Sequence, residues 1–302
     1  MSTNQLRTWV VRGYILLFFL YLFGPLLIMS ASAFNASSYP TITPWEGTTV
    51  KWFGELAAND RLVNGFINSL WVGCGVVALS VPTALAGAIM LMQVSEKVRP
   101  IYYTIVVSPV LVPGVIIGIS TVIFWERFGS LVGLDYETTN NPFFLTIVGQ
   151  STFISAYCML VFIARLQRFD KTQEEAALDL GATHVQVFWK VLIPFLRPAI
   201  LSSIVLAFLT SFENYNTTVF TMVARGTLTT ELAGLARFGV NPSISALAVV
   251  IMGFTLIGAV IYEIKKRREE AIVEASKRRA AMKRMKDTEA AAEQVAVAAA
   301  AG

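Results

Sequence analysis

The residues of this chain that could carry chemistry are few, and they form no set that is typical of catalysis. His184 is the single histidine, and it lies in a polar stretch where an exposed or interfacial role is expected. No nucleophile with an adjacent base and no catalytic pair of carboxylates stands out, so the sequence predicts no reaction on a substrate. Cys74 and Cys158 lie in apolar runs without metal-ligand spacing, and we expect them to be buried as small hydrophobic groups.

The strongest pattern is a polar segment between two apolar runs. It contains three acidic residues, two small residues, a glycine and a proline, which are Glu174, Glu175, Asp179, Ala176, Ala177, Gly181 and Pro194. Small side chains let a partner approach the helix backbone, and the acidic side chains offer contacts to a basic cleft. This favours a docking surface for a soluble partner. The alternative is an ordinary capped amphipathic helix in a long loop, and composition alone leaves both open.

Local signals predict that this segment is helix–turn–helix. Thr172 and Glu175 fit a capping box at the start of a helix of about eight residues. Gly181 suits a left-handed C-terminal cap. Thr183 with Gln186 repeats the capping-box pattern and starts a second helix. That helix reaches toward the proline, which is expected to break or bend it.

A second polar string follows directly on the fifth apolar run. With two polar residues of the fourth run, it supplies the residues of a possible pathway: Ser211, Glu213, Asn214, Tyr215, Gln150 and Tyr157. Ionisable groups at membrane depth are expensive and commonly line a pathway. Apart from Arg197 near the start of the fifth run, no predicted span contains Lys or Arg, so Glu213 could be met by a partner subunit, by water or by a cationic substrate. The alternative is a solvated Glu213 at the outer interface.

Long apolar runs must position these residues. The 302-residue chain is 55% hydrophobic and 15% charged, whereas soluble domains carry about 25% charged residues. A membrane core of roughly 30 Å needs about 20 apolar residues per helix. Six runs meet this requirement, at 13–33, 66–92, 101–124, 143–164, 195–213 and 244–262. The sequence therefore predicts an all-α polytopic membrane protein with six transmembrane helices.

Details of three runs add expectations. The first imitates a signal peptide, with Ala31-Ser32-Ala33 at a cleavage-like position, but it exceeds the usual core of roughly 7–15 residues, so we expect it to be retained as a span. Gly73 and Gly75 in the second predict close helix packing. Pro109 and Pro113 in the third predict a kink, which either lines a pathway or is a plain packing bend.

The basic residues orient the chain. All but five of the 24 Lys and Arg residues fall on the side of 1–12, 93–100, 165–197 and 263–302. By the positive-inside rule these parts are cytoplasmic, so we expect both termini to lie on the cytoplasmic side of the membrane. The net charge of +4 then reflects this topology, with most of the basic surplus beside the inner leaflet of membrane lipid, and it does not indicate nucleic-acid binding.

The predicted organisation follows from this topology. Residues 1–12 form a cytoplasmic N-terminus, 13–262 a transmembrane domain with a cytoplasmic loop at 165–194, and 263–302 a basic, alanine-rich cytoplasmic tail. The tail is rich in good helix formers, which favours a frayed helical extension over a defined interaction module.

The loop resembles the EAA loop of ABC importer membrane subunits. Its order is Glu-Ala-Ala from Glu175, three residues, Gly181, nine residues, and then Val-Leu-Ile-Pro ending at Pro194. The resemblance extends to Trp52-Phe53, Asn68-Ser69-Leu70 and Asn241-Pro242, and it is strongest to the second permease of spermidine/putrescine-type importers.

This resemblance implies a type I permease fold in a bacterial inner membrane and a coupling helix in the loop at 165–194. The helix would enter a groove of a cytoplasmic ABC ATPase dimer, which binds ATP and Mg. A second, homologous permease and a periplasmic substrate-binding protein would complete the importer. The chain lacks a G-x-x-x-x-G-K-[ST] phosphate loop, so the ATPase must be a separate subunit.

The predicted function is the permease subunit of an ATP-driven importer for a small polar, cationic, polyamine-like solute. Polyamine-type relatives tend to carry several acidic residues near Glu213, whereas Asn214 follows it here, which leaves polyamine itself open. An ATP-independent channel or secondary transporter is the alternative, and a scaffold for an unrelated cytoplasmic protein is another.

Overall fold

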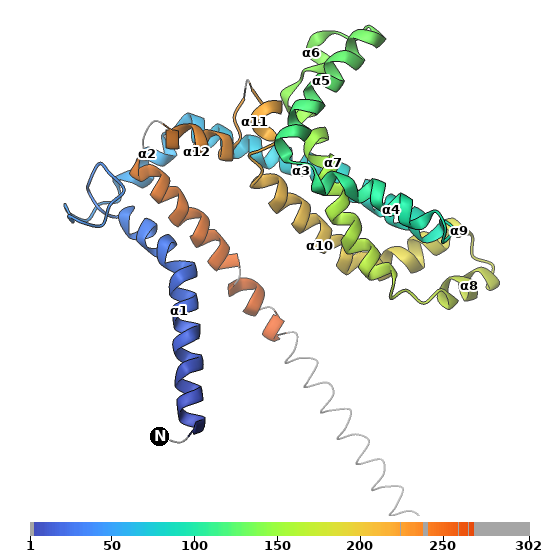
Figure 1. The fold of residues 1–302 in the computed structure, drawn as a ribbon, viewed down its shortest axis with the longest axis horizontal. Helices are drawn as coiled ribbons and strands as arrows, with labels where there is room; N and C mark the ends of the chain where they lie inside the picture. Colours follow the sequence, from blue (N-terminus) through green and yellow to red (C-terminus); the bar gives the residue numbers. More distant parts are fainter. Residues whose placement is uncertain (1–2, 224, 238–240, 259, 265, 269–302) are drawn as a thin grey trace, which may run out of the picture. The chain divides into compact units, whose positions relative to one another are not determined.

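The computed structural model describes residues 3–223, 225–237, 241–258, 260–264 and 266–268, and these are mainly helical, without a sheet strand among them. The labelled helices, shown in Figure 1, are α1 Thr3–Ser32, α2 Lys51–Ala57, α3 Asp60–Gln93, α4 Arg99–Val107, η1 Ser108–Leu111, α5 Gly114–Val132, α6 Tyr136–Thr139, α7 Pro142–Leu166, α8 Thr172–Asp179, α9 His184–Val187, η2 Phe188–Leu192, α10 Ile193–Phe212, α11 Thr218–Thr221 and α12 Leu228–Arg237. A further helix covers 242–258 and 260–264.

The predicted number of membrane helices agrees with the structure. Six helices of the described residues are long and apolar enough to span a membrane: Arg7–Ser32, Asp60–Gln93, Gly114–Val132, Pro142–Leu166, His184–Phe212 and Pro242–Arg268. Five of them contain the predicted runs or most of their residues. The predicted tail lies outside the described residues from 269 onward.

The prediction that residues 101–124 form a single kinked helix is wrong. The chain there forms α4, the 3-10 turn η1 and then α5, with a break at Val112 and Pro113. Pro113 has ψ 133°, outside the helical region, and its ring carries no N–H to continue a helical ladder. The long helix of this region therefore begins at Gly114 and continues to Val132, beyond the predicted end.

The chain divides into two compact units, of which the larger runs from Gly54 to Asn241. Its core is formed by α3, α7 and α10, which pack on one another. Ile154, Phe162 and Leu196 are fully buried in it. A Cβ built on Gly73 would lie 2.9 Å from the Phe208 ring, so the predicted close packing at this glycine is confirmed.

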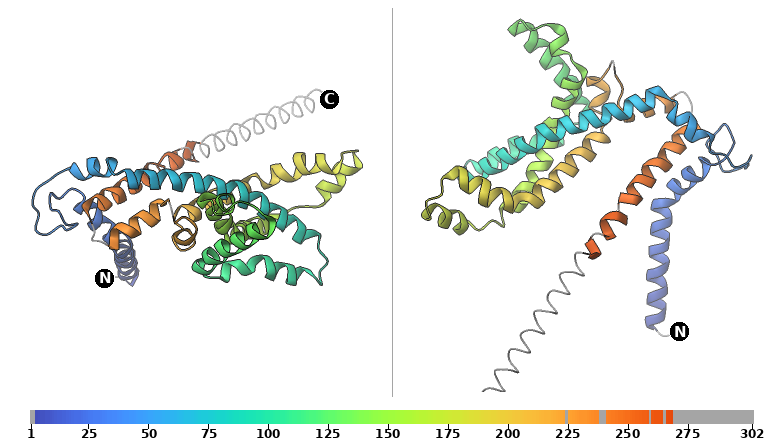
Figure 2. Two further views of the ribbon diagram at one scale, coloured as in Figure 1. Left: turned by 90° about the horizontal axis from the view of Figure 1, so that it is seen from above. Right: turned by 180° about the vertical axis from the view of Figure 1, so that it is seen from behind.

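The larger unit has polar elements at both ends of this helical core. Helices α8 and α9 lie beyond one end, and α12 lies beside the other end of α3 (Figures 1 and 2). Cys158 is buried between helices of the core, as expected, whereas Cys74 is exposed on α3, contrary to the expectation. The unit therefore separates the two polar regions that the sequence singled out.

The smaller unit contains the described residues up to Phe53 and those from Pro242 on. Ser32 in α1 donates a hydrogen bond to Ser245, at 3.0 Å. Between α1 and α2 the chain forms a closed loop around Asn35, whose buried amide donates to the carbonyls of Thr41 and Pro44. Trp52 Nε1 donates to the Asn35 carbonyl at 2.8 Å and fixes the end of this loop.

Candidate functional site

Helix α8 has the predicted length, but its N-terminus is formed differently from the prediction. Asp170 Oδ1 accepts hydrogen bonds from the Thr172 backbone N–H at 3.0 Å and from the Thr172 hydroxyl at 2.8 Å. Thr172 is thus the first helical residue with its hydroxyl already engaged, and Lys171 at the cap position makes no side-chain cap bond. The predicted Thr172–Glu175 capping box is therefore wrong. The same hydrogen bonds, chiefly that from the Thr172 side chain, lower the pKa of Asp170.

The end of α8 forms as predicted. Gly181 has φ +83°, in the left-handed region that favours glycine. Its N–H donates to the Leu178 carbonyl at 2.8 Å, and the N–H of Ala182 donates to the Ala177 carbonyl at 3.0 Å. These two bonds are those of a Schellman motif, which satisfies helix-end carbonyls that would otherwise lack a partner.

The second helix begins at the predicted capping box. The Thr183 hydroxyl accepts from the Gln186 N–H, and the Gln186 side chain accepts from the Thr183 N–H, at 3.3 and 3.0 Å. The helix does not break at Pro194. It passes from α9 through the π-turn η2 into α10, and its direction changes there (Figure 1). The wide π-turn ends at Leu192, two residues before Pro194, which can therefore lie in the first turn of α10 without ending the helix.

The predicted docking residues are close together, except for Pro194. Glu175, Ala176 and Asp179 are exposed on α8, whereas Glu174 and Ala177 are partly buried. Pro194 lies apart from them in α10, where it shapes the base of the loop.

The structure adds an apolar surface to this loop that the sequence reasoning missed. Leu180, Val185 and Trp189 are 89%, 67% and 63% exposed. Val185 and Trp189 are four residues apart on a continuous helix and so share a face, which is the signal that could have identified them. The loop therefore carries exposed apolar side chains beside its exposed acidic ones.

Some of the predicted pathway residues form a buried polar network. Ser211 donates to Gln150 Oε1 at 2.5 Å, and Gln150 Nε2 donates to Thr218 Oγ1 at 2.8 Å. Thr218 in turn donates to the Asn214 carbonyl at 2.8 Å. Gln150 and Thr218 are fully buried, and these hydrogen bonds give the side chains of both residues partners within the chain. The network joins α7, α10 and α11.

The remaining pathway residues lie outside this network. Glu213 is the C-cap residue of α10 and is exposed. It forms no ion pair with another described residue. Tyr215 is partly buried, and its hydroxyl accepts a hydrogen bond from Arg237 Nη2 at 3.2 Å. Tyr157 lies two turns beyond Gln150 on α7, where its ring contacts Phe153.

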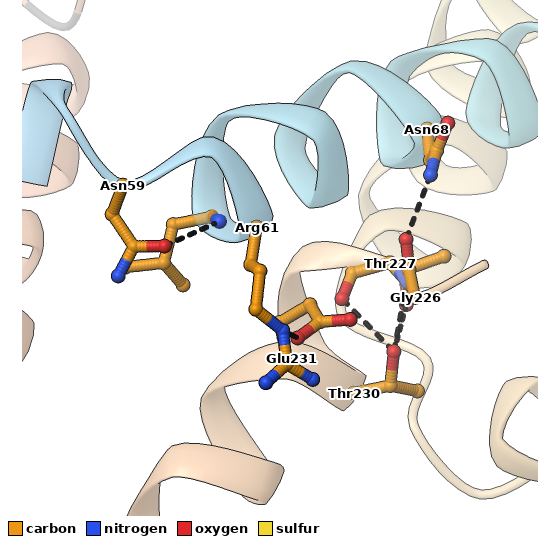
Figure 3. A network of polar contacts seen from close by, with 8 residues as sticks. Asn59, Arg61, Asn68, Gly226, Thr227, Thr230 and Glu231 are labelled. Carbon is orange, nitrogen blue, oxygen red and sulfur yellow. Dashed lines mark hydrogen bonds and ion pairs between the residues drawn. The ribbon is translucent and has the colours of Figure 1, made fainter.

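A further polar cluster, which the sequence reasoning missed, holds α12 against α3 (Figure 3). Asn68 Nδ2 donates to the Gly226 carbonyl at 2.9 Å. Arg61 Nε lies 3.2 Å from the Glu231 carboxylate, whose side chain is 17% exposed. Thr229 in α12 also donates to the Asn214 carbonyl at 3.2 Å, so this cluster reaches the segment that follows Glu213.

Comparison with known proteins places this arrangement in context. Residues 52–270 match the family model described as "Binding-protein-dependent transport system inner membrane component". The chain is 30% identical over 262 residues to the putrescine transport system permease protein PotI of Escherichia coli K12, covering 85% of this chain and 90% of that protein. It is 23% identical over 256 residues to the spermidine/putrescine transport system permease protein PotC of the same organism, covering 84% and 93%.

Solved structures agree on the fold. One chain from the crystal structure of a bacterial ABC transporter involved in the import of the acidic polysaccharide alginate superposes with a TM-score of 0.64 at 20% identity, covering 86% of this chain and 95% of that one. A chain from the same kind of transporter, in complex with an alginate pentasaccharide-bound periplasmic protein, superposes with a TM-score of 0.65 at 19% identity, covering 87% and 95%.

Proposed function

Because this chain belongs to the family of binding-protein-dependent transport system inner membrane components and is the permease subunit of an ABC importer, we propose that its loop from α8 to η2 is the docking surface for a cytoplasmic ABC ATPase. The observation that carries this proposal is the geometry of α8. Asp170 accepts from the first N–H of the helix and a Schellman motif closes its C-terminus; the helix has no buried residue and presents Glu175, Ala176 and Asp179 outward. A rigid helix with small and acidic exposed side chains suits insertion into a basic groove.

The apolar residues of the loop extend this surface. Leu180, Val185 and Trp189 would lose most of their exposed area against a partner, and apolar burial contributes about 25 cal/mol per Å². The acidic residues of α8 would then give orientation and selectivity more than affinity.

The proposed assembly contains three kinds of partner. A pair of ATPase subunits binds ATP and Mg, a second homologous permease completes the membrane part, and a periplasmic binding protein delivers the substrate. The name of the family supports dependence on a binding protein, and the PotI and PotC relatives support a polyamine-type importer. With the loop facing the ATPase, both termini of the chain face the cytoplasm.

The proposed substrate is a small, polar, cationic solute of the polyamine class. Two relatives are named for putrescine and spermidine transport. Glu213 supports a cation because it is exposed at the end of α10 with no ion pair among the described residues. The buried Gln150–Ser211–Thr218 network acts as the support that fixes the segment after Glu213.

Co-purification tests the docking proposal. Glu175→Arg is expected to weaken recovery of the ATPase with the permease, because the substitution places a cation against a basic groove. Glu96→Arg is the matched control, since Glu96 is also exposed and lies in the preceding loop on the predicted cytoplasmic side. Equal recovery of the ATPase with the wild type and both variants would rule the proposal out, and it would favour an ATP-independent channel or an unrelated scaffold partner.

A further inference from the structure

The base of the docking loop is held by three residues, which we call the loop anchor: Arg165, Phe169 and Phe195. Arg165 lies in the last turn of α7, and Phe195 lies in the first turn of α10. Arg165 donates from both Nε and Nη2 to the Phe195 carbonyl, each at 3.2 Å. Its guanidinium carbon also lies 4.2 Å from the centroid of the Phe195 ring.

Phe169 adds a second contact to the same residue. Its ring centroid lies 5.0 Å from that of Phe195, with the ring planes at 58°. Phe195 is therefore contacted by the end of α7 and by the first residues of the loop. The fork of donors and the stacked guanidinium plane are properties of Arg, and Lys offers neither.

Helix α8 is joined to the long helices by two connections, and both of them reach the loop anchor. No residue of α8 is buried, and the helix packs on α9 and η2. One connection from α8 to the long helices is the short segment 167–171, which contains Phe169. The other runs through η2 into α10, where Phe195 is the third residue. Both connections meet at Phe195.

We propose that the loop anchor transmits displacement of α8 to α7 and α10, with Arg165 as the positioning residue that makes the two helices move together. This inference rests on the proposed docking of the ATPase to α8. Without the anchor, α8 would still bind its partner, but its movement would be absorbed by the segment 167–171 and by the π-turn. ATP hydrolysis would then continue with less transport.

The experiment measures substrate uptake per ATP hydrolysed in proteoliposomes that contain the whole importer. Arg165→Lys keeps the charge and removes the pair of N–H donors and the planar guanidinium over the ring, and Phe195→Leu removes the ring. Each is expected to lower uptake per ATP by roughly tenfold, because Arg165→Lys weakens a charge-assisted contact and Phe195→Leu removes the ring contacts with Arg165 and Phe169. Phe195→Tyr keeps the ring and is expected to restore most of the coupling.

Arg168→Lys is the matched control, because Arg168 is exposed three residues beyond Arg165, in the segment that joins α7 to α8. It is expected to keep the wild-type ratio. Recovery of the ATPase with each variant shows that the loop is folded and separates the two proposals. If Arg165→Lys retains wild-type uptake per ATP, or loses ATPase binding together with uptake, transmission through the anchor is refuted. If the ATPase binds equally to wild type and to Glu175→Arg, docking itself fails.

Discussion

Gly181→Ala is the cleanest perturbation of the docking loop. Gly181 has φ +83°, and a Cβ built on it meets no atom within 4 Å, so the substitution introduces backbone strain without a clash. Forcing a non-glycine residue into the left-handed region costs about 1–2 kcal/mol. The variant can relieve this strain when free by unwinding the end of α8, where the Schellman bonds of Gly181 and Ala182 lie.

ATPase binding to the variant must restore the strained turn. The apparent Kd for the ATPase is therefore expected to rise by a factor of about 5–30, the factor that corresponds to 1–2 kcal/mol. Gly181→Asn should have a smaller effect, because Asn tolerates this backbone region better than Ala. Binding of the purified ATPase to permease in nanodiscs, measured by titration, gives the three affinities.

Gly133→Ala is the matched control for this titration. Gly133 also has a left-handed φ, +73°, and its Cβ would also meet no atom within 4 Å, but it caps α5 rather than α8. It is expected to leave the ATPase affinity unchanged. An unchanged Kd for Gly181→Ala, or an equal rise for Gly133→Ala, would refute the reasoning that this turn shapes the docking surface.

Three further predictions concern the other polar groups. Glu213→Gln is expected to lower uptake of cationic substrate severalfold while the ATPase still co-purifies, and unchanged transport kinetics would reject a role in the pathway. Gln150→Leu leaves the Ser211 hydroxyl without its buried acceptor, so a loss of about 1–3 kcal/mol should appear as a lower Tm of the purified protein, and a wild-type Tm would contradict the network. Because hydrogen bonds from Thr172 lower the pKa of Asp170, its support of α8 is present above the ordinary Asp pKa and is lost as the pH falls through the lowered pKa. Asp170→Ala should thus speed hydrogen exchange in α8 at neutral pH and make little difference in acid, and a pH-independent difference would oppose this assignment.

The docking loop could be predicted largely from sequence because its signals are local. Gly181 and the Thr183–Gln186 box specify backbone geometry within a few residues, and the structure confirms both. Thr172 was misassigned because Asp170, two residues before it, competes for the same helix end. Two capping residues in one short stretch cannot be ranked from spacing alone.

The membrane helices were also predicted correctly where local sequence decides and incorrectly where long-range packing decides. Length and hydropathy predict six helices, since each needs only its own composition to suit a membrane. The break at Pro113 displaced the third helix, because a proline pattern does not say whether a helix bends or ends. Cys74 was misjudged because an apolar run does not show which of its faces is covered.

The polar contacts at the other end of the larger unit were largely beyond sequence reasoning. Gln150 and Ser211 were selected for polarity, but their hydrogen bond joins residues 61 positions apart. Helix α12 was missed because its position depends on Asn68 and Arg61, which lie far earlier in the chain (Figure 3). Such pairings follow from the packing of helices, which no local pattern encodes.

The central claim, that the α8 loop docks the ATPase, is tested most directly by photocrosslinking in the assembled importer. A photoreactive residue placed at Glu175 or at Leu180 should form an adduct with the ATPase, since both positions are exposed on the proposed docking surface. The same residue at Leu131, which is 86% exposed on α5, should form none. Absence of an adduct from Glu175 and Leu180 while the ATPase remains bound, or an adduct from Leu131, would contradict the account.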